Sequence, residues 1–171
     1  MSPDLDLQNK MDYEQQCLDS GIHVTAIKAL VEHIGFKLLN VSPRLTQEAD
    51  WAGIDIYFTY VDPKTHKAKT LDADIKFRDG RDYGDVLYNW KRGNSPGWAH
   101  RDSNKVNDVV LYIVRSSRKI MMTTRRDMYN AFDYLSSKPL VKSGDQRQSN
   151  IMMSYEECRK YFPNFVGPIN F

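Results

Sequence analysis

The chain lacks the features that mark several common functional classes. Its two cysteines, Cys17 and Cys158, lie far apart and form no Cys-x-x-Cys pair, so neither a zinc cluster nor a disulfide framework is indicated. No Walker loop or dinucleotide fingerprint occurs, and the four histidines follow no metal-ligand spacing. We therefore assign no histidine as a ligand, and we expect no serine to act as an acyl-transfer nucleophile.

Long apolar runs are also missing. No stretch approaches the roughly 18 to 20 apolar residues that span a bilayer. The N-terminal stretch carries acids, such as Asp4 and Asp6, where a signal peptide would be basic and then apolar. With so few cysteines, these absences predict a soluble, reduced, cytoplasmic protein that does not associate with membranes.

An excess of one charge is absent from the chain as a whole but present locally. The 24 Lys and Arg residues nearly balance the 22 Asp and Glu residues. Between residues 91 and 126, however, nine basic residues face only Asp102 and Asp108. A solvated face is the plain interpretation, and a surface that meets a polyanion is the functional one.

The length of 171 residues and the 41% hydrophobic content predict one domain, with a core over about 21–135. Apolar periodicity predicts a helix over 21–34 that ends at Gly35, and residues 10–17 could form an earlier helical turn. Residues 136–150 are polar and are expected to form a loop. The predicted strands and later helices are strands over 36–41, 53–60, 70–78, 106–114 and 120–123, a helix capped by Thr124, and a short helix from Ser154.

Acids on the two alternating strands carry the chemistry. A hairpin turn centred between Lys64 and Thr65 places Asp55 opposite Asp74. Opposed like charges destabilise a sheet unless a cation neutralises them. Lys76 projects from the same face as Asp74. Two carboxylates and a lysine suit phosphodiester hydrolysis assisted by Mg²⁺, because hard oxygen ligands hold this ion and it can activate water.

These residues resemble the signature of the PD-(D/E)XK nuclease superfamily, over about residues 22–114. The matching motifs are Gly53-Ile54-Asp55 and Asp74-Ile75-Lys76. The resemblance implies a restriction-endonuclease-like α/β (α+β) fold with an αβββαβ core, a central mixed sheet and flanking helices. It also implies that Mg²⁺, or Mn²⁺ in its place, is held by Asp55, Asp74 and the carbonyl of Ile75, with Lys76 as the catalytic lysine. The segment around Trp90 would form the helix after the third strand.

One departure concerns the first helix, where many family members carry a glutamate. Residues 22–25 hold no acid. Glu14 and Glu32 are the alternatives, with Glu14 ranked first because Glu32 lies near the helix end and is expected to face solvent. Asp50 and Asp72 are further candidates for accessory acids.

We therefore expect a Mg²⁺-dependent DNA endonuclease, with RNA left open as a substrate, which acts as a homodimer or recognises a DNA structure. The alternative is a nucleic-acid- or protein-binding module that keeps the nuclease fold without cutting. Trp90 and Trp98 could stack on bases, although packing is the commoner role of tryptophan. The residues expected to contact nucleic acid are Arg78, Arg81, Lys91, Arg92, Arg101 and Lys105.

Overall fold

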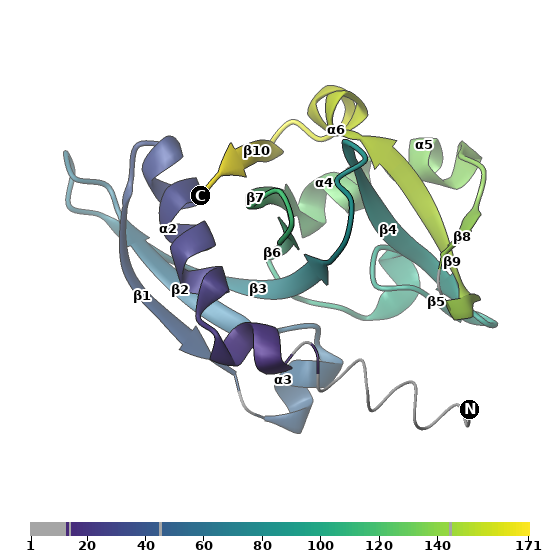
Figure 1. Cartoon of the computed structure of the whole chain (residues 1–171), viewed down its shortest axis with the longest axis horizontal. Coiled ribbons are helices and arrows are strands. Elements are labelled where there is room, and N and C mark those ends of the chain that lie inside the picture. Colours follow the sequence, from purple (N-terminus) through teal and green to yellow (C-terminus); the bar gives the residue numbers. More distant parts are fainter. Residues whose placement is uncertain (1–12, 14, 45, 144) are drawn as a thin grey trace.

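The structure is a computed structural model that describes residues 13, 15–44, 46–143 and 145–171. It contains two β-sheets and several short helices (Figure 1). The helices are α2 (Ile22–His33), α3 (Gln47–Trp51), η1 (Arg101–Ser103), α4 (Arg125–Asn130), α5 (Phe132–Ser137) and α6 (Tyr155–Tyr161). The strands are β1 (Lys37–Pro43), β2 (Ile56–Val61), β3 (Ala68–Arg78), β4 (Asp85–Arg92), β5 (Ser95–Pro96), β6 (Val109–Val114), β7 (Lys119–Thr124), β8 (Val141–Ser143), β9 (Asp145–Ser154) and β10 (Val166–Asn170).

The central sheet has six strands in the order β1-β2-β3-β6-β7-β10. Strands β3 and β6 run parallel, and the other neighbours run antiparallel, so the sheet is mixed. In the β2–β3 hairpin Ile56 pairs with Ala73 and Tyr57 pairs with Asp72. This is the register predicted from a turn between Lys64 and Thr65.

Helix α2 covers one face of the central sheet, as Figure 1 shows. Its buried residues Ile27 and Leu30 pack against Phe58 of β2 and Leu111 of β6. The helix ends in a Schellman motif, in which the amides of residues 35 and 36 donate to the carbonyls of residues 32 and 31. The predicted helix over 21–34 is confirmed, and residues 15–19 before it are also helical.

The second sheet packs against the opposite face and has the order β5-β4-β9-β8. Its residues Tyr88 and Ile151 share a core with Val110 and Tyr112 of β6. Because Leu111 belongs to the core under α2, β6 is buried on both faces, as its unbroken apolar sequence predicted. The exposed Val106 shows that this strand begins three residues later than predicted.

Two sequence predictions are wrong in the second sheet. The segment with Trp90, Lys91 and Arg92 is strand β4, not a helix, because its alternating side chains pack against β9. Residues 136–150, predicted as a loop, contain β8 and the first part of β9. Polar side chains there gave no apolar alternation, whereas pairing with β4 supplies the backbone hydrogen bonds.

The architecture is therefore α+β, with a mixed central sheet and several helices. The element order of the expected αβββαβ core differs after β3, where the described chain forms β4, β5 and the short η1 before β6. Two predicted caps are confirmed: Thr124 caps α4, and Ser154 with Glu157 forms a capping box at α6. None of the described helices is both long and apolar enough to cross a membrane.

Candidate functional site

Asp55 and Asp74 meet between the two sheets, at the start of β2. The peptide amide of Asp55 donates to the carbonyl of Ala73 at 2.9 Å, which is one residue out of the hairpin register, because Ala73 pairs with Ile56 in the ladder. Gly53 makes this turn possible, because its φ of 76° is unfavourable for other residues. A side chain there would also meet the Lys105 side chain at 2.9 Å.

The carboxylate of Asp55 accepts a backbone hydrogen bond from β3, as the carbonyl of a neighbouring strand would. Its Oδ2 accepts a 2.7 Å hydrogen bond from the amide of Ile75. Burial, and next the charge of Asp74, raise the pKa of Asp55 to about 7, although Lys76 and the Ile75 amide act in the opposite direction. In the absence of a cation, Asp55 is therefore harder to ionise near neutral pH than an ordinary aspartate.

Lys76 supplies a positive charge at the same point. Its Nζ lies 2.9 Å from Oδ1 of Asp74, whose side chain is only 4% exposed, whereas that of Lys76 is 29% exposed. Nζ also lies 5.7 Å from the centre of the Trp98 ring. The lysine therefore pairs with a buried carboxylate while part of its side chain faces an open space.

That open space is a cleft of about 370 Å³ between α3 on one side and strands of the second sheet on the other. It is lined by Asp50, Trp51, Gly53, Asp55, Asp74, Lys76, Asn89, Arg92, Pro96, Gly97, Trp98, Lys105 and Gln148. The acids, the lysine and two of the predicted nucleic-acid contacts, Arg92 and Lys105, thus share one cavity. The sequence predicted that the acids and the lysine would meet, and the structure adds that Arg92 and Lys105 line the same cavity.

The other predicted contacts lie outside the cleft lining. Arg81 and Lys91 are exposed. Arg101 is exposed and sits 3.8 Å above the ring of Phe132. Arg78 is engaged in an ion pair with Asp85 and is mostly buried, so it is not free to grip a phosphate as it stands.

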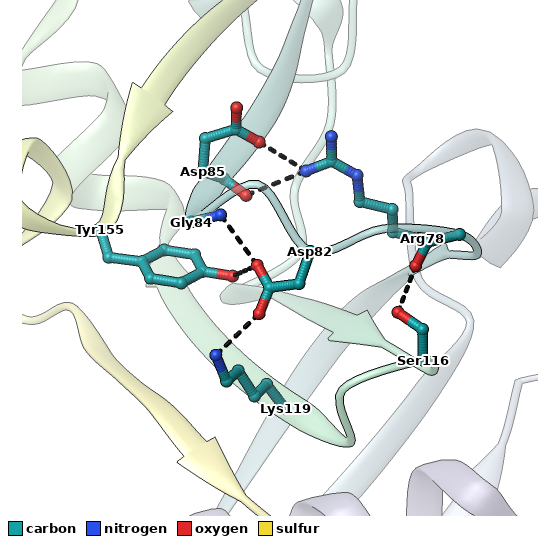
Figure 2. Close-up of polar contacts among 8 residues, drawn as sticks. Arg78, Asp82, Gly84, Asp85, Ser116, Lys119 and Tyr155 are labelled. Carbon is teal, nitrogen blue, oxygen red and sulfur yellow. Dashed lines mark hydrogen bonds and ion pairs between the residues drawn. The ribbon is translucent and has the colours of Figure 1, made fainter.

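Figure 2 shows the polar network that contains Arg78. Below the Arg78–Asp85 pair, Asp82 accepts hydrogen bonds from the Gly84 amide, the Tyr155 hydroxyl and the Lys119 ammonium. These donors outweigh burial and hold the pKa of Asp82 well below its usual range. The network ties the loop before β4 to β7 and α6, which indicates a structural role.

Arg125 is a buried residue beside the acids that sequence reasoning missed. Its guanidinium donates to the Trp98 carbonyl at 2.5 Å and to Oδ1 of Asn107 at 2.6 Å, and it interacts electrostatically with Asp74. It is 6% exposed and its Nε lacks a hydrogen-bond partner within the described chain. Because Arg125 begins α4, its place in the capping sequence gave no signal of this role.

Replacing Arg125 by methionine is expected to lower the free energy of unfolding by about 2 to 4 kcal/mol, because two buried acceptors lose a charged donor. Arg125→Lys keeps the charge and should lose less. Urea unfolding measures both. The control is Arg126→Met at the adjacent, exposed position, and equal effects at 125 and 126 would contradict the role assigned to Arg125.

The cleft wall opposite α3 depends on a close backbone contact. A Cβ on Gly97 would lie 2.2 Å from the Asn89 carbonyl oxygen, so glycine is required where the chain leaves β5. This glycine also ends a Gly-x-Ser-x-Gly spacing over 93–97. Its Ser95 is exposed in the β4–β5 hairpin rather than on a strand-to-helix turn, so the spacing does not make a nucleophile.

The candidate accessory acids lie in different parts of the structure. Asp50 lines the cleft and also a second cavity of about 440 Å³ that reaches Asp55 and the buried His23. Asp72 lies 3.5 Å from Arg44, and the exposed Glu32 lies 3.9 Å from Lys28. Glu14 lies outside the described residues.

The donor set at Asp55 and Asp74 fits a hard divalent cation. Two carboxylates that repel one another, held beside a backbone strand, are ligands of the kind that Mg²⁺ and Mn²⁺ prefer. No larger group of three or more His, Cys, Asp or Glu side chains is arranged for a metal in the described part of the chain. An ion here would need carbonyl or water oxygens as its remaining ligands.

The chain matched no protein-family model, no curated protein and no solved structure.

Proposed function

We propose that this protein is a divalent-metal-dependent nuclease that hydrolyses DNA phosphodiester bonds, with a restriction-endonuclease-like core of the PD-(D/E)XK type. The observation that carries the proposal is the meeting of the half-buried Asp55 and the buried Asp74 beside Lys76 in one open cleft. A structural ion pair needs one acid for one lysine. The second acid, Asp55, has a pKa raised by burial and next by the charge of Asp74, which is a cost that a bound cation would lower.

Asp55 and Asp74 would hold the cation, with the Ile75 carbonyl as a third ligand. A bound Mg²⁺ would supply Lewis-acid stabilisation of phosphate charge and a lower pKa for water. Lys76 reaches the cleft from the Asp74 side and can donate a hydrogen bond to a phosphate oxygen or orient the attacking water. Arg92 and Lys105 line the same cleft and offer positive charge to the flanking phosphates.

Metal binding and cutting test the proposal together. Thermal unfolding with Mg²⁺ or Mn²⁺ is expected to show a rise in Tm that Asp74→Ala abolishes. Purified protein is expected to cut plasmid, linear or single-stranded DNA only with the metal, and the Asp74→Ala variant is expected to be inactive. Asp72→Ala, on the same strand but paired with Arg44, is the matched control.

A folded wild-type protein that binds DNA but shows neither a metal-dependent Tm shift nor cleavage would overturn the nuclease assignment. It would favour the alternative, a binding module that keeps the fold without the chemistry.

A further inference from the structure

Trp51 is a large apolar side chain that stays exposed at the proposed active site. It is the last residue of α3 and is 64% exposed. It lines the same cleft as Asp55, Asp74 and Lys76. A single exposed apolar residue on a surface needs no explanation, but this one lines a cleft that also holds the buried Asp74 and the half-buried Asp55.

The backbone that carries Trp51 is held firmly. Lys105 Nζ donates to the Trp51 carbonyl at 2.9 Å, and the Val106 amide donates to the Ala52 carbonyl at 2.9 Å. At the other end of α3, the Thr46 hydroxyl caps the helix by accepting from the Ala49 amide. The indole is thus presented from a fixed position, which lowers the ordering cost of a contact with a ligand.

The opposite wall of the cleft supplies polar groups. Arg92 of β4 and Gln148 of β9 line it, together with Asn89. The cleft volume of about 370 Å³ lies at the lower end of the range for small-ligand sites, roughly 300 to 1,000 Å³. An aromatic ring on one wall and hydrogen-bond donors on the other suit a base and its phosphate.

We propose that Trp51 is a stacking platform for an unpaired base of a single-stranded nucleic-acid segment. Bases inside a duplex already stack on one another, so their faces are covered, whereas an unpaired base can offer its face to an indole. Stacking does not distinguish deoxyribose from ribose, so DNA and RNA are separated by experiment. The inference rests on the proposed function, because it assigns the strand that enters the nuclease cleft.

The test measures binding without cleavage. Fluorescence anisotropy in EDTA and low salt compares a labelled 12-nucleotide oligo(dT), the matching oligo(U) and a 12-base-pair duplex. Wild-type protein is expected to bind a single strand more tightly than the duplex. Trp51→Ala is expected to weaken single-strand binding roughly 10- to 100-fold, and Trp51→Phe to restore most of it. Leu39→Ala, 55% exposed on the edge strand β1, is the control for loss of an exposed apolar side chain.

A second readout follows the indole itself. Binding of the single strand is expected to quench tryptophan fluorescence, and Trp51→Ala should remove that part of the quenching while its Tm stays unchanged. Equal binding by wild type and Trp51→Ala, preference for the duplex, or no binding of either single strand would overturn the platform. Tighter binding of either sugar supports it and assigns DNA or RNA.

The two proposals can fail separately. If cleavage depends on the metal and on Asp74, but Trp51→Ala binds single strands as wild type does, only the stacking proposal is wrong. If single-strand binding in EDTA depends on Trp51, but no metal condition gives cleavage, only the nuclease assignment is wrong.

Discussion

The Lys76→Met variant is expected to cut DNA about 10²- to 10⁴-fold more slowly than wild type in Mg²⁺ while still binding the metal. Methionine approximates the length of lysine but removes the charge that lies 2.9 Å from Asp74. Since Lys76 is not a proposed ligand, the metal-dependent rise in Tm should persist. Single-turnover cleavage and thermal unfolding, each with and without Mg²⁺, separate the two effects.

Lys69→Met is the matched control, because Lys69 is exposed on the same strand and pairs with Tyr60. It should cut at the wild-type rate. The metal-free Lys76→Met protein should also be less stable than wild type, because the buried Asp74 loses its counter-charge. If the Lys76→Met variant cuts DNA at the wild-type rate, this lysine takes no part in the reaction.

Cleavage is expected to increase with pH between about 6 and 8, because Asp55 has a pKa of about 7 without metal and must ionise to hold a cation. The apparent midpoint should move to lower pH as the Mg²⁺ concentration rises, since the ion favours the ionised carboxylate. Rate profiles at two Mg²⁺ concentrations measure this shift. A flat profile across this range, or a midpoint that does not move with Mg²⁺, would contradict the role of Asp55.

The same group predicts how the stability of the metal-free protein depends on pH. Folding raises the pKa of Asp55 from 3.8 to about 7, so the protonated form is favoured in the folded state. The stability from this proton is fully present below about pH 3.8 and is lost as pH rises through about 7. The full loss would be about 4 kcal/mol, and screening at this half-buried side chain reduces it to roughly 2 kcal/mol.

Urea unfolding at pH 5.5 and 8.5 in EDTA tests this second consequence. Asp55→Asn cannot ionise, so its stability should fall less than that of wild type over the same interval. Added Mg²⁺ should restore wild-type stability at the higher pH but have little effect on the variant. Identical pH dependence in both proteins would show that another group is responsible.

Local patterns in the sequence were sufficient for the elements nearest the proposed site. Alternating side chains predicted both strands of the β2–β3 hairpin, and the turn position predicted their register. Periodic apolar residues predicted α2, and capping residues predicted the starts of α4 and α6. These features depend on neighbours within a few residues along the chain, so a single sequence contains the information.

The second sheet could not be predicted in the same way. Strand β9 is polar along much of its length and becomes a strand by pairing with β4, some 60 residues earlier. The resemblance to a nuclease core led to the wrong prediction of a helix at β4, although Val86, Tyr88 and Trp90 alternate there as in a strand. Non-local backbone pairing outweighed local polarity in one case and the family pattern in the other.

The sequence by itself determined that Asp55, Asp74 and Lys76 come together, because the hairpin register brings the residue before β2 close to Asp74, and strand alternation places Asp74 and Lys76 on one face of β3. Only the tertiary structure decided what surrounds them. Arg125 of α4 lies beside Asp74 and is held by Trp98 and Asn107. Arg78 forms an ion pair with Asp85, and Trp51 is exposed in the lining of the cleft. The contacts of Arg125 and Trp51 depend on packing between segments distant in the chain, and the Arg78–Asp85 pair depends on how the loop between β3 and β4 folds back, which no local pattern encodes.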